Sequence, residues 1–123
     1  MSEAAPSLLD ALFEQSPQPC YVFDRETLRF LAVNAAACAL YGWSRDEMLA
    51  LSLRDIRPEA DVERLEYIVA QKRHLAGNFT RMSRHRTRDG RVFEVDLDMR
   101  RVMVDGRVAT LVIVTDLTAA SEA

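Results

Sequence analysis

The C-terminal third of the chain contains two Asp-Gly pairs, and these pairs most constrain how it can fold. Asp89-Gly90 and Asp105-Gly106 each separate stretches in which apolar and polar residues alternate. Asp-Gly is a favoured pair for two-residue hairpin turns, because such turns need positive φ at both central positions. The spacing therefore predicts three consecutive antiparallel strands, at about 78–88, 91–104 and 107–117.

A two-residue turn also sets the register of its hairpin. Pairing Arg88 with Arg91 places Arg84 opposite Val95 on one face and His85 opposite Glu94 on the other. The same arithmetic across the second turn places Met99 opposite Val112 and Leu97 opposite Val114. We expect helices to cover the more apolar face, which carries Phe93, Val95, Leu97, Met99, Val112 and Val114.

The last strand is apolar on its other face as well, through Ala109, Leu111 and Ile113. A strand that is apolar on both faces is normally buried on both faces. The candidate to cover this outer face is the apolar stripe of a predicted N-terminal helix, made of Leu8, Leu9, Leu12 and Phe13. The cover comes either from the same chain or from a second copy in a homodimer.

The elements before the meander complete one α+β domain. Ser7 with an acidic residue three positions later predicts a capped helix over 7–16. Two short strands follow at 20–23 and 29–33, and Asn34 is a typical N-cap for the next helical turn. A longer helix follows Pro58. Together they predict a five-stranded antiparallel sheet, with helices covering one face and the N-terminal helix on the outer face.

Composition excludes several classes of protein. The chain has 123 residues, 49% of them hydrophobic, and a net charge of −3, which fits one globular domain and argues against a dedicated nucleic-acid binder. The basic run at 81–88 faces acids on the next predicted strand and has no aromatic stacking platform, so we expect no nucleic-acid contact. No apolar stretch reaches membrane-spanning length, and we expect no membrane contact. Cys20 and Cys38 form no CxxC pair, which predicts a reduced, cytoplasmic setting and no metal site.

Seven short motifs follow one another along the chain at characteristic spacings. They are FEQSP at 13–17, Asp24, VNAA at 33–36, YGWS at 41–44, EML at 47–49, RDGR at 88–91 and TDLT at 115–118. In this order the chain resembles the PAS domain family over nearly its whole length. The resemblance implies a five-stranded antiparallel sheet that encloses a cavity with its helices. Members of the family are sensors or dimerisation modules in signalling proteins.

The resemblance also implies how the chain is organised. We expect residues 1–6 to be a flexible tail, 7–118 a single PAS domain, and 119–123 the start of a linker to an effector domain. Asp116 and Thr118 belong to the motif at which the fold passes its signal to that effector. The chain is then the N-terminal input module of a larger, bacterial-type signalling or regulatory protein, and the type of effector stays open.

PAS domains differ in what occupies the cavity, and two cofactors are not expected here. Haem-binding members use a histidine within the long helix. In this chain His74 lies in the last turn of that helix and His85 on the polar hairpin face, so both are expected to be exposed. Photoactive flavin-binding members carry the motif GxNCRFLQ, which this chain lacks, and we expect Cys38 to pack as a small apolar group. A small organic ligand and no ligand at all both stay open.

The candidate lining of the cavity combines the inner sheet face with residues of the covering helices. It consists of Val22, Tyr41, Trp43, Met48, Leu65, Val69, Met82, Arg84, Phe93, Val95, Leu97, Met99, Val112 and Val114. The same residues also suit an ordinary dry core. Arg84 either anchors an anion at the cavity mouth or reaches past the sheet edge to water.

We expect no catalysis, because this face offers no carboxylate except Asp116, which belongs to the handover motif. The main alternative to a ligand-binding sensor is a ligand-free interaction or dimerisation module. A small cone-shaped α+β enzyme ranks below both.

Overall fold

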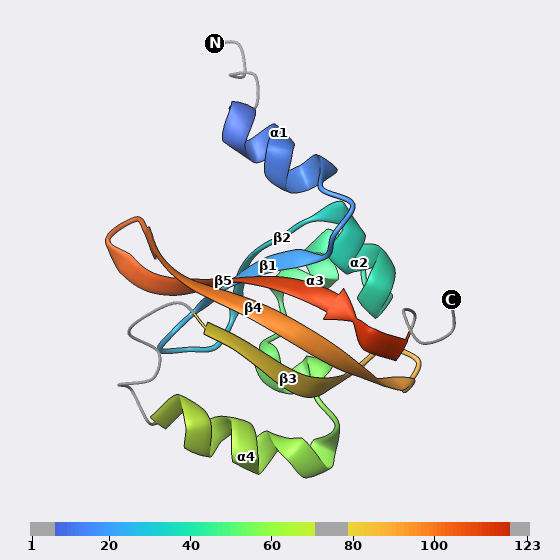
Figure 1. Ribbon diagram of the computed structural model, residues 1–123. Helices are drawn as coiled ribbons and strands as arrows, with labels where there is room; N and C mark the ends of the chain where they lie inside the picture. The colour runs from blue at the N-terminus through green and yellow to red at the C-terminus, as the bar shows by residue number, and fades with distance from the viewer. Residues whose placement is uncertain (1–6, 71–78, 119–123) are drawn as a thin grey trace.

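The computed structural model describes residues 7–70 and 79–118, and these ranges contain helices on one side of a curved sheet (Figure 1). In chain order the elements are α1 (Leu8–Gln15), β1 (Cys20–Asp24), β2 (Phe30–Val33), α2 (Ala35–Tyr41), α3 (Arg45–Leu49), the 3-10 helix η1 (Leu53–Ile56), α4 (Glu59–Ala70), β3 (Phe79–Arg86), β4 (Val92–Val104) and β5 (Arg107–Asp116). Our predictions for 1–6, His74 and 119–123 lie outside the described residues, as does the side chain of Val69.

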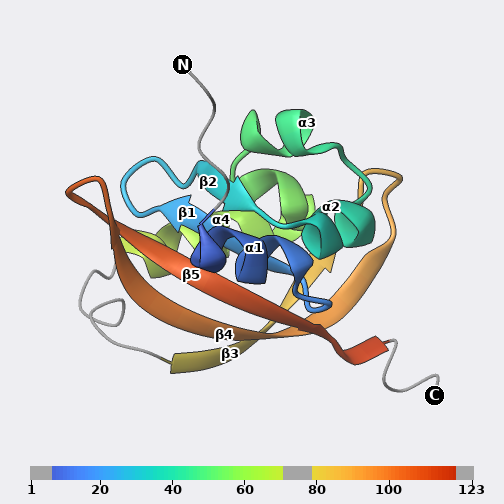
Figure 2. The ribbon, with the colours of Figure 1, turned by 90° about the horizontal axis from the view of Figure 1, so that it is seen from above.

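The five strands form one sheet in the order β2-β1-β5-β4-β3, and each strand runs antiparallel to its neighbours. Because β1 pairs with β5, the first and last strands lie side by side in the middle of the sheet. Viewed from above, α2, α3 and α4 lie on the same side of the curved β3–β5 meander (Figure 2). This arrangement confirms the predicted α+β fold class.

The second hairpin has the predicted register. Asp105 and Gly106 form its turn with φ of 48° and 78°, the positive values that a two-residue turn requires. Met99 accordingly pairs with Val112, and Leu97 with Val114. The six apolar residues predicted for the inner face are all buried, which confirms that face: Phe93, Val95, Leu97, Met99, Val112 and Val114.

The first hairpin differs from the prediction by one residue. The N–H of Thr87 donates to the carbonyl of Arg91 at 2.9 Å, so the loop has three residues, and only Gly90 within it has positive φ, 93°. A type I turn followed by a left-handed glycine is the common three-residue solution. His85 therefore pairs with Phe93, where the sequence analysis paired it with Glu94. A shift of one residue moves every side chain of β3 to the opposite face.

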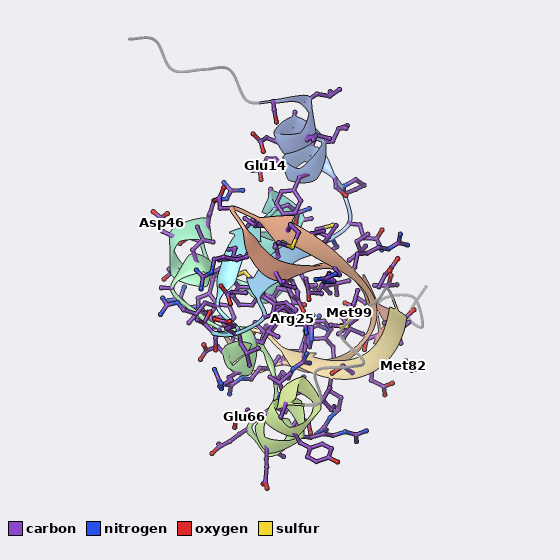
Figure 3. All side chains as sticks on the ribbon, turned by 90° about the vertical axis from the view of Figure 1, so that its left-hand side faces the viewer. Glu14, Arg25, Asp46, Glu66, Met82 and Met99 are labelled. Atoms are coloured by element: carbon purple, nitrogen blue, oxygen red, sulfur yellow. The ribbon has the colours of Figure 1, made fainter. Side chains whose placement is uncertain are left out.

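The shift corrects three predictions on β3. His85 is fully buried on the inner face, where we expected it on the polar face. Met82 is 64% exposed, and Figure 3 shows it on the outer edge of the sheet, away from Met99 on the inner side. Arg84 is exposed and forms a bidentate ion pair with Asp61 of α4, in which its Nη2 and Nε donate to the two carboxylate oxygens at 2.8 and 3.0 Å. It therefore does not enter the interior.

Helix α1 begins as predicted but does not cover the outer face of its own sheet. Ser7 caps it in a reciprocal capping box with Asp10. The helix lies beside α2 and projects from the body of the domain (Figure 1). Its Leu8, Leu9 and Leu12 are 74%, 76% and 60% exposed. The prediction that α1 covers the outer face of β5 within the same chain is therefore wrong.

The outer face of β5 is partly covered without α1. Leu111 and Ile113 are half-buried, and Ala109 is fully buried. The two half-buried side chains thus keep part of their apolar surface available on this face.

Asn34 connects the base of α1 to the rest of the domain. Its side-chain oxygen accepts from the N–H groups of Cys20 and Ala37 at 3.0 and 2.9 Å, which confirms it as the N-cap of α2. Its side-chain nitrogen donates to the carbonyls of Phe13 and Gln18 at 3.1 and 3.0 Å. All four hydrogen-bonding positions of this buried amide are thereby used. The exit of α1 is fixed against β1 and α2.

Candidate functional site

The interior between the sheet and the helices is lined mostly by apolar and aromatic side chains. Tyr21 and Phe30 meet edge-on with ring centroids 5.1 Å apart, and Tyr41 lies 6.0 Å from Phe93. Of the predicted lining, these members belong to the buried cluster: Tyr41, Met48, Leu65, Phe93, Val95, Leu97, Met99, Val112 and Val114. Trp43 is half-buried and packs against that cluster.

Two pairs of polar side chains lie within this apolar interior, and the sequence analysis predicted neither of them. The hydroxyl of Tyr41 and Nδ1 of His85 are 2.6 Å apart. Two residues earlier on β3, the hydroxyl of Ser83 accepts from Nη1 of Arg57 at 2.8 Å. Ser83 and His85 share a strand face because alternate residues of a strand point the same way. The structure therefore gathers an imidazole, a phenol and a guanidinium on the inner side.

The local backbone explains why Arg57 enters the interior. It follows η1 and precedes Pro58, with φ of −116° and ψ of 148°. A residue before proline is restricted to this extended region. The backbone therefore becomes extended directly after the 3-10 helix. The last residue of that helix, Ile56, is buried, and the next residue, Arg57, is only 5% exposed.

Three polar atoms of this cluster have no hydrogen-bond partner within the part of the chain that the structure describes. They are Oη of Tyr21, Nε of Arg57 and Nε2 of His85, and each belongs to a residue at least nine-tenths buried. Buried polar atoms are normally paired, with protein, with water or with a ligand. These three atoms therefore mark where the interior has unused hydrogen-bonding capacity.

Burial and the charge of Arg57 determine the protonation states in the cluster. Burial, and secondly the nearby Arg57, lowers the pKa of His85 well below its ordinary value. Burial raises the pKa of Tyr21 to about 12, although Arg57 opposes the rise. Burial likewise raises the pKa of Tyr41 well above its ordinary value. At neutral pH the imidazole and both phenols are uncharged, and the guanidinium carries the positive charge.

Three predicted lining residues lie elsewhere. Met82 and Arg84 lie outside because of the register shift on β3. Val22 pairs with Leu111 on the outer face of the sheet, because its neighbours Tyr21 and Phe23 point inward. The sequence contains one signal for the inward position of His85, which is the cost of burying each face of β3. Placing Ser83 and His85 inside costs less than placing Arg84 and Arg86 there.

The predicted handover residues lie where β5 ends. Asp116 is 3.5 Å from Nη2 of Arg91, in the loop region between β3 and β4. Its carboxylate also accepts from the N–H of Thr118 at 2.9 Å. The Thr118 hydroxyl accepts from the N–H of Glu94 on β4 at 3.4 Å. The end of β5 is thereby connected to the hairpin that carries His85.

Two further properties concern metals and membranes. Among the residues that the structure describes, no three His, Cys, Asp or Glu side chains come together as ligands for a metal ion. Within 7–70 and 79–118, no helix is both long and apolar enough to cross a membrane.

Comparison with known proteins identifies the family. The family model of the PAS fold matches residues 7–117. No curated protein matches the chain. Among solved structures, a domain of the sensory box sensor histidine kinase/response regulator from Geobacter sulfurreducens is 28% identical, with a TM-score of 0.69 over 86% of this chain and 89% of that chain.

Two further structures are similar over comparable lengths. The PAS domain of an HTR-like protein from Haloarcula marismortui is 26% identical, with a TM-score of 0.75 over 88% of each chain. A PAS domain from a two-component sensor histidine kinase is 24% identical, with a TM-score of 0.73 over 86% of this chain and 90% of that chain. The fold, the motif order and the extent of the family match together show that the chain belongs to the PAS family.

Proposed function

We propose that this PAS domain is the sensory input module of a larger signalling protein and that it binds a small molecule in its interior. The proposal is supported by the family and by similar domains from a sensor histidine kinase/response regulator. The observation that carries it is the presence, on side chains at least nine-tenths buried, of three polar atoms that have no hydrogen-bond partner among the described residues. A dry core of the same shape would gain stability from apolar side chains at those positions.

In this proposal the signal leaves through the end of β5. A ligand that contacts His85 on β3 acts on the same hairpin to which Arg91 belongs. Arg91 and Asp116 then transmit a shift of that hairpin to the chain that follows Thr118. A ligand changes such an equilibrium only by binding one arrangement better than the other. We propose no catalytic activity for the domain itself.

We also propose that the domain forms a homodimer through α1. The stripe of Leu8, Leu9 and Leu12 is exposed on a helix that is fixed at its base by Asn34. The half-buried Leu111 and Ile113 offer apolar surface on the outer face of β5. A second copy of the chain that buries these surfaces supplies the cover that the sequence analysis expected.

The two free cysteines, Cys20 and Cys38, support a cytoplasmic setting.

Two measurements test this function. Mass analysis of small molecules released from freshly purified protein, with a near-ultraviolet and visible absorbance spectrum, tests ligand binding. We expect a stoichiometric small molecule without a haem or flavin spectrum, and an empty protein that also binds no compound from a metabolite library would contradict the ligand proposal.

Light scattering tests the dimer. The variant Leu9→Asp should shift it toward monomer, whereas Gln15→Asp, also exposed on α1, should not. Equal effects of the two variants would contradict an apolar interface at α1.

A further inference from the structure

We propose that the interior binds its small molecule through a carboxylate group, with Nε of Arg57 as the anchor and His85 and Tyr21 as further hydrogen-bond partners. This inference rests on the proposed function, because it names the chemical class of the ligand. It replaces Arg84, the arginine that the sequence suggested as an anion anchor, by one that lies inside the domain. The two arginines differ in their surroundings.

Arg57 is a buried cation whose charge is not neutralised at hydrogen-bond distance. Its Nη1 donates to the neutral hydroxyl of Ser83, and its Nε has no hydrogen-bond partner within 7–70 and 79–118. Within the described residues, no carboxylate forms an ion pair with it. Asp61 lies within reach of its electrostatic field, but that carboxylate is held by Arg84 at 2.8 and 3.0 Å. Burying a guanidinium without a counter-charge is costly, so an anion that enters the interior gains from meeting it.

His85 adds a second donor to the same interior. Its Nδ1 lies 2.6 Å from the Tyr41 hydroxyl, and we assign the tautomer in which that hydroxyl donates to Nδ1. A neutral imidazole that accepts at Nδ1 carries its proton on Nε2. The partnerless Nε2 is then a donor, like Nε of Arg57. Two inward donors without acceptors favour a ligand rich in acceptor atoms.

Tyr21 lies on β1, and its hydroxyl also has no hydrogen-bond partner in the part of the chain that the structure describes. The positive charge of Arg57 acts on the phenols of Tyr21 and Tyr41 and on the imidazole of His85. The remaining surroundings are apolar, among them Met48, Val95 and Leu97. Such surroundings select a ligand with one anionic end and an apolar body.

The decisive test compares carboxylates with neutral molecules of the same shape. We would titrate the protein with acetate, butyrate and benzoate, and with acetamide, butyramide and benzamide. Binding is followed calorimetrically and by nitrogen NMR of Arg57 Nε and His85 Nε2. At least one carboxylate should bind about 10- to 100-fold more tightly than its amide and shift both nitrogens. Amides that bind as tightly as carboxylates, binding that leaves both nitrogens unmoved, or no carboxylate binding would overturn the inference.

Matched variants test the anchor. Arg57→Gln should weaken the bound carboxylate about 10- to 100-fold. Arg54→Gln removes a charge from the same segment, but its arginine pairs with Glu66 on the surface at 3.2 Å, so it should leave binding unchanged. Equal effects of the two would overturn Arg57 as the anchor. If Arg57→Gln does not fold, the comparison of carboxylates with amides in the unmodified protein still decides whether the interior binds a carboxylate at Arg57. A neutral molecule released from purified protein would refute the carboxylate and leave the sensory proposal standing.

Discussion

Protonation of the buried imidazole of His85 should destabilise the domain as the pH falls. Burial, with the charge of Arg57 as the second cause, lowers the pKa of this group well below its ordinary value. The unfolded chain has no such environment, so its imidazole titrates near about 6.5. Below that pH the imidazole of His85 binds a proton in the unfolded state but stays neutral in the folded state. The free energy of unfolding therefore falls as the pH drops through the unfolded pKa, and it continues to fall until the folded imidazole also titrates.

The size of the effect follows from the unfolded pKa. At about pH 7.5 the imidazole is neutral in both states and contributes almost nothing. At about pH 5, an imidazole that stays neutral in the folded state lowers the free energy of unfolding by about 2 kcal/mol. Other ionisable groups of the chain add their own pH dependence. The contribution of His85 must therefore be measured as a difference between two proteins.

Urea denaturation of the unmodified protein and of His85→Asn, at about pH 7.5 and about pH 5, isolates that difference. Asparagine has no titrating group, and its side-chain oxygen takes the place of Nδ1 as acceptor for Tyr41. We expect the unmodified protein to lose about 2 kcal/mol more than the variant between the two pH values. Equal losses in the two proteins would mean that His85 titrates as in the unfolded chain, and the reasoning from its burial would be wrong.

Three further predictions concern stability at neutral pH and are measured by urea denaturation. Leu97→Ala, at a fully buried position of β4, should cost about 2–5 kcal/mol, whereas Met82→Ala at the exposed outer edge should change stability by less than about 0.5 kcal/mol. Comparable losses of stability in the two variants would contradict the assignment of Leu97 to the buried inner face and Met82 to the exposed outer face. Gly106→Ala should cost about 1–2 kcal/mol, because φ there is 78°, and a variant as stable as the unmodified protein would contradict that turn. Asp24→Asn should cost about 1–3 kcal/mol, because this buried carboxylate accepts from two backbone N–H groups and pairs with Arg107 at 2.8 Å, and a neutral effect would contradict that role.

The two hairpins show how far the sequence determines the sheet. Both turns contain Asp-Gly, but only Asp105-Gly106 forms the two-residue loop. At the first turn Thr87 pairs with Arg91, and its hydroxyl accepts from the Arg91 N–H at 3.1 Å, which fixes a three-residue loop. The dipeptide alone does not distinguish the two turn types. On β5 the apolar residues settle the register, whereas neither face of 82–87 is apolar.

The caps and the apolar face were predictable because they depend on nearby residues or on simple alternation. Ser7 and Asn34 cap their helices as predicted. The interior polar cluster depends on tertiary packing. Arg57 precedes Pro58 far from β3 in the sequence, and only the folded chain brings it to Ser83. The position of α1 depends on Asn34, whose cap was predicted but whose two bonds to the exit of α1 were not.

The most direct test of the account is the register of β3 against β4, because it decides whether His85 lies inside. Thr87 and Arg91 form a hydrogen-bonded pair, so Arg84 and Glu94 form a non-hydrogen-bonded pair with closely spaced α-carbons. Proton NMR should give a strong contact between the α-protons of Arg84 and Glu94. A strong contact between the α-protons of His85 and Glu94 would indicate the register of a two-residue turn, in which these two residues form the non-hydrogen-bonded pair. It would move His85 to the outer face and remove the interior cluster.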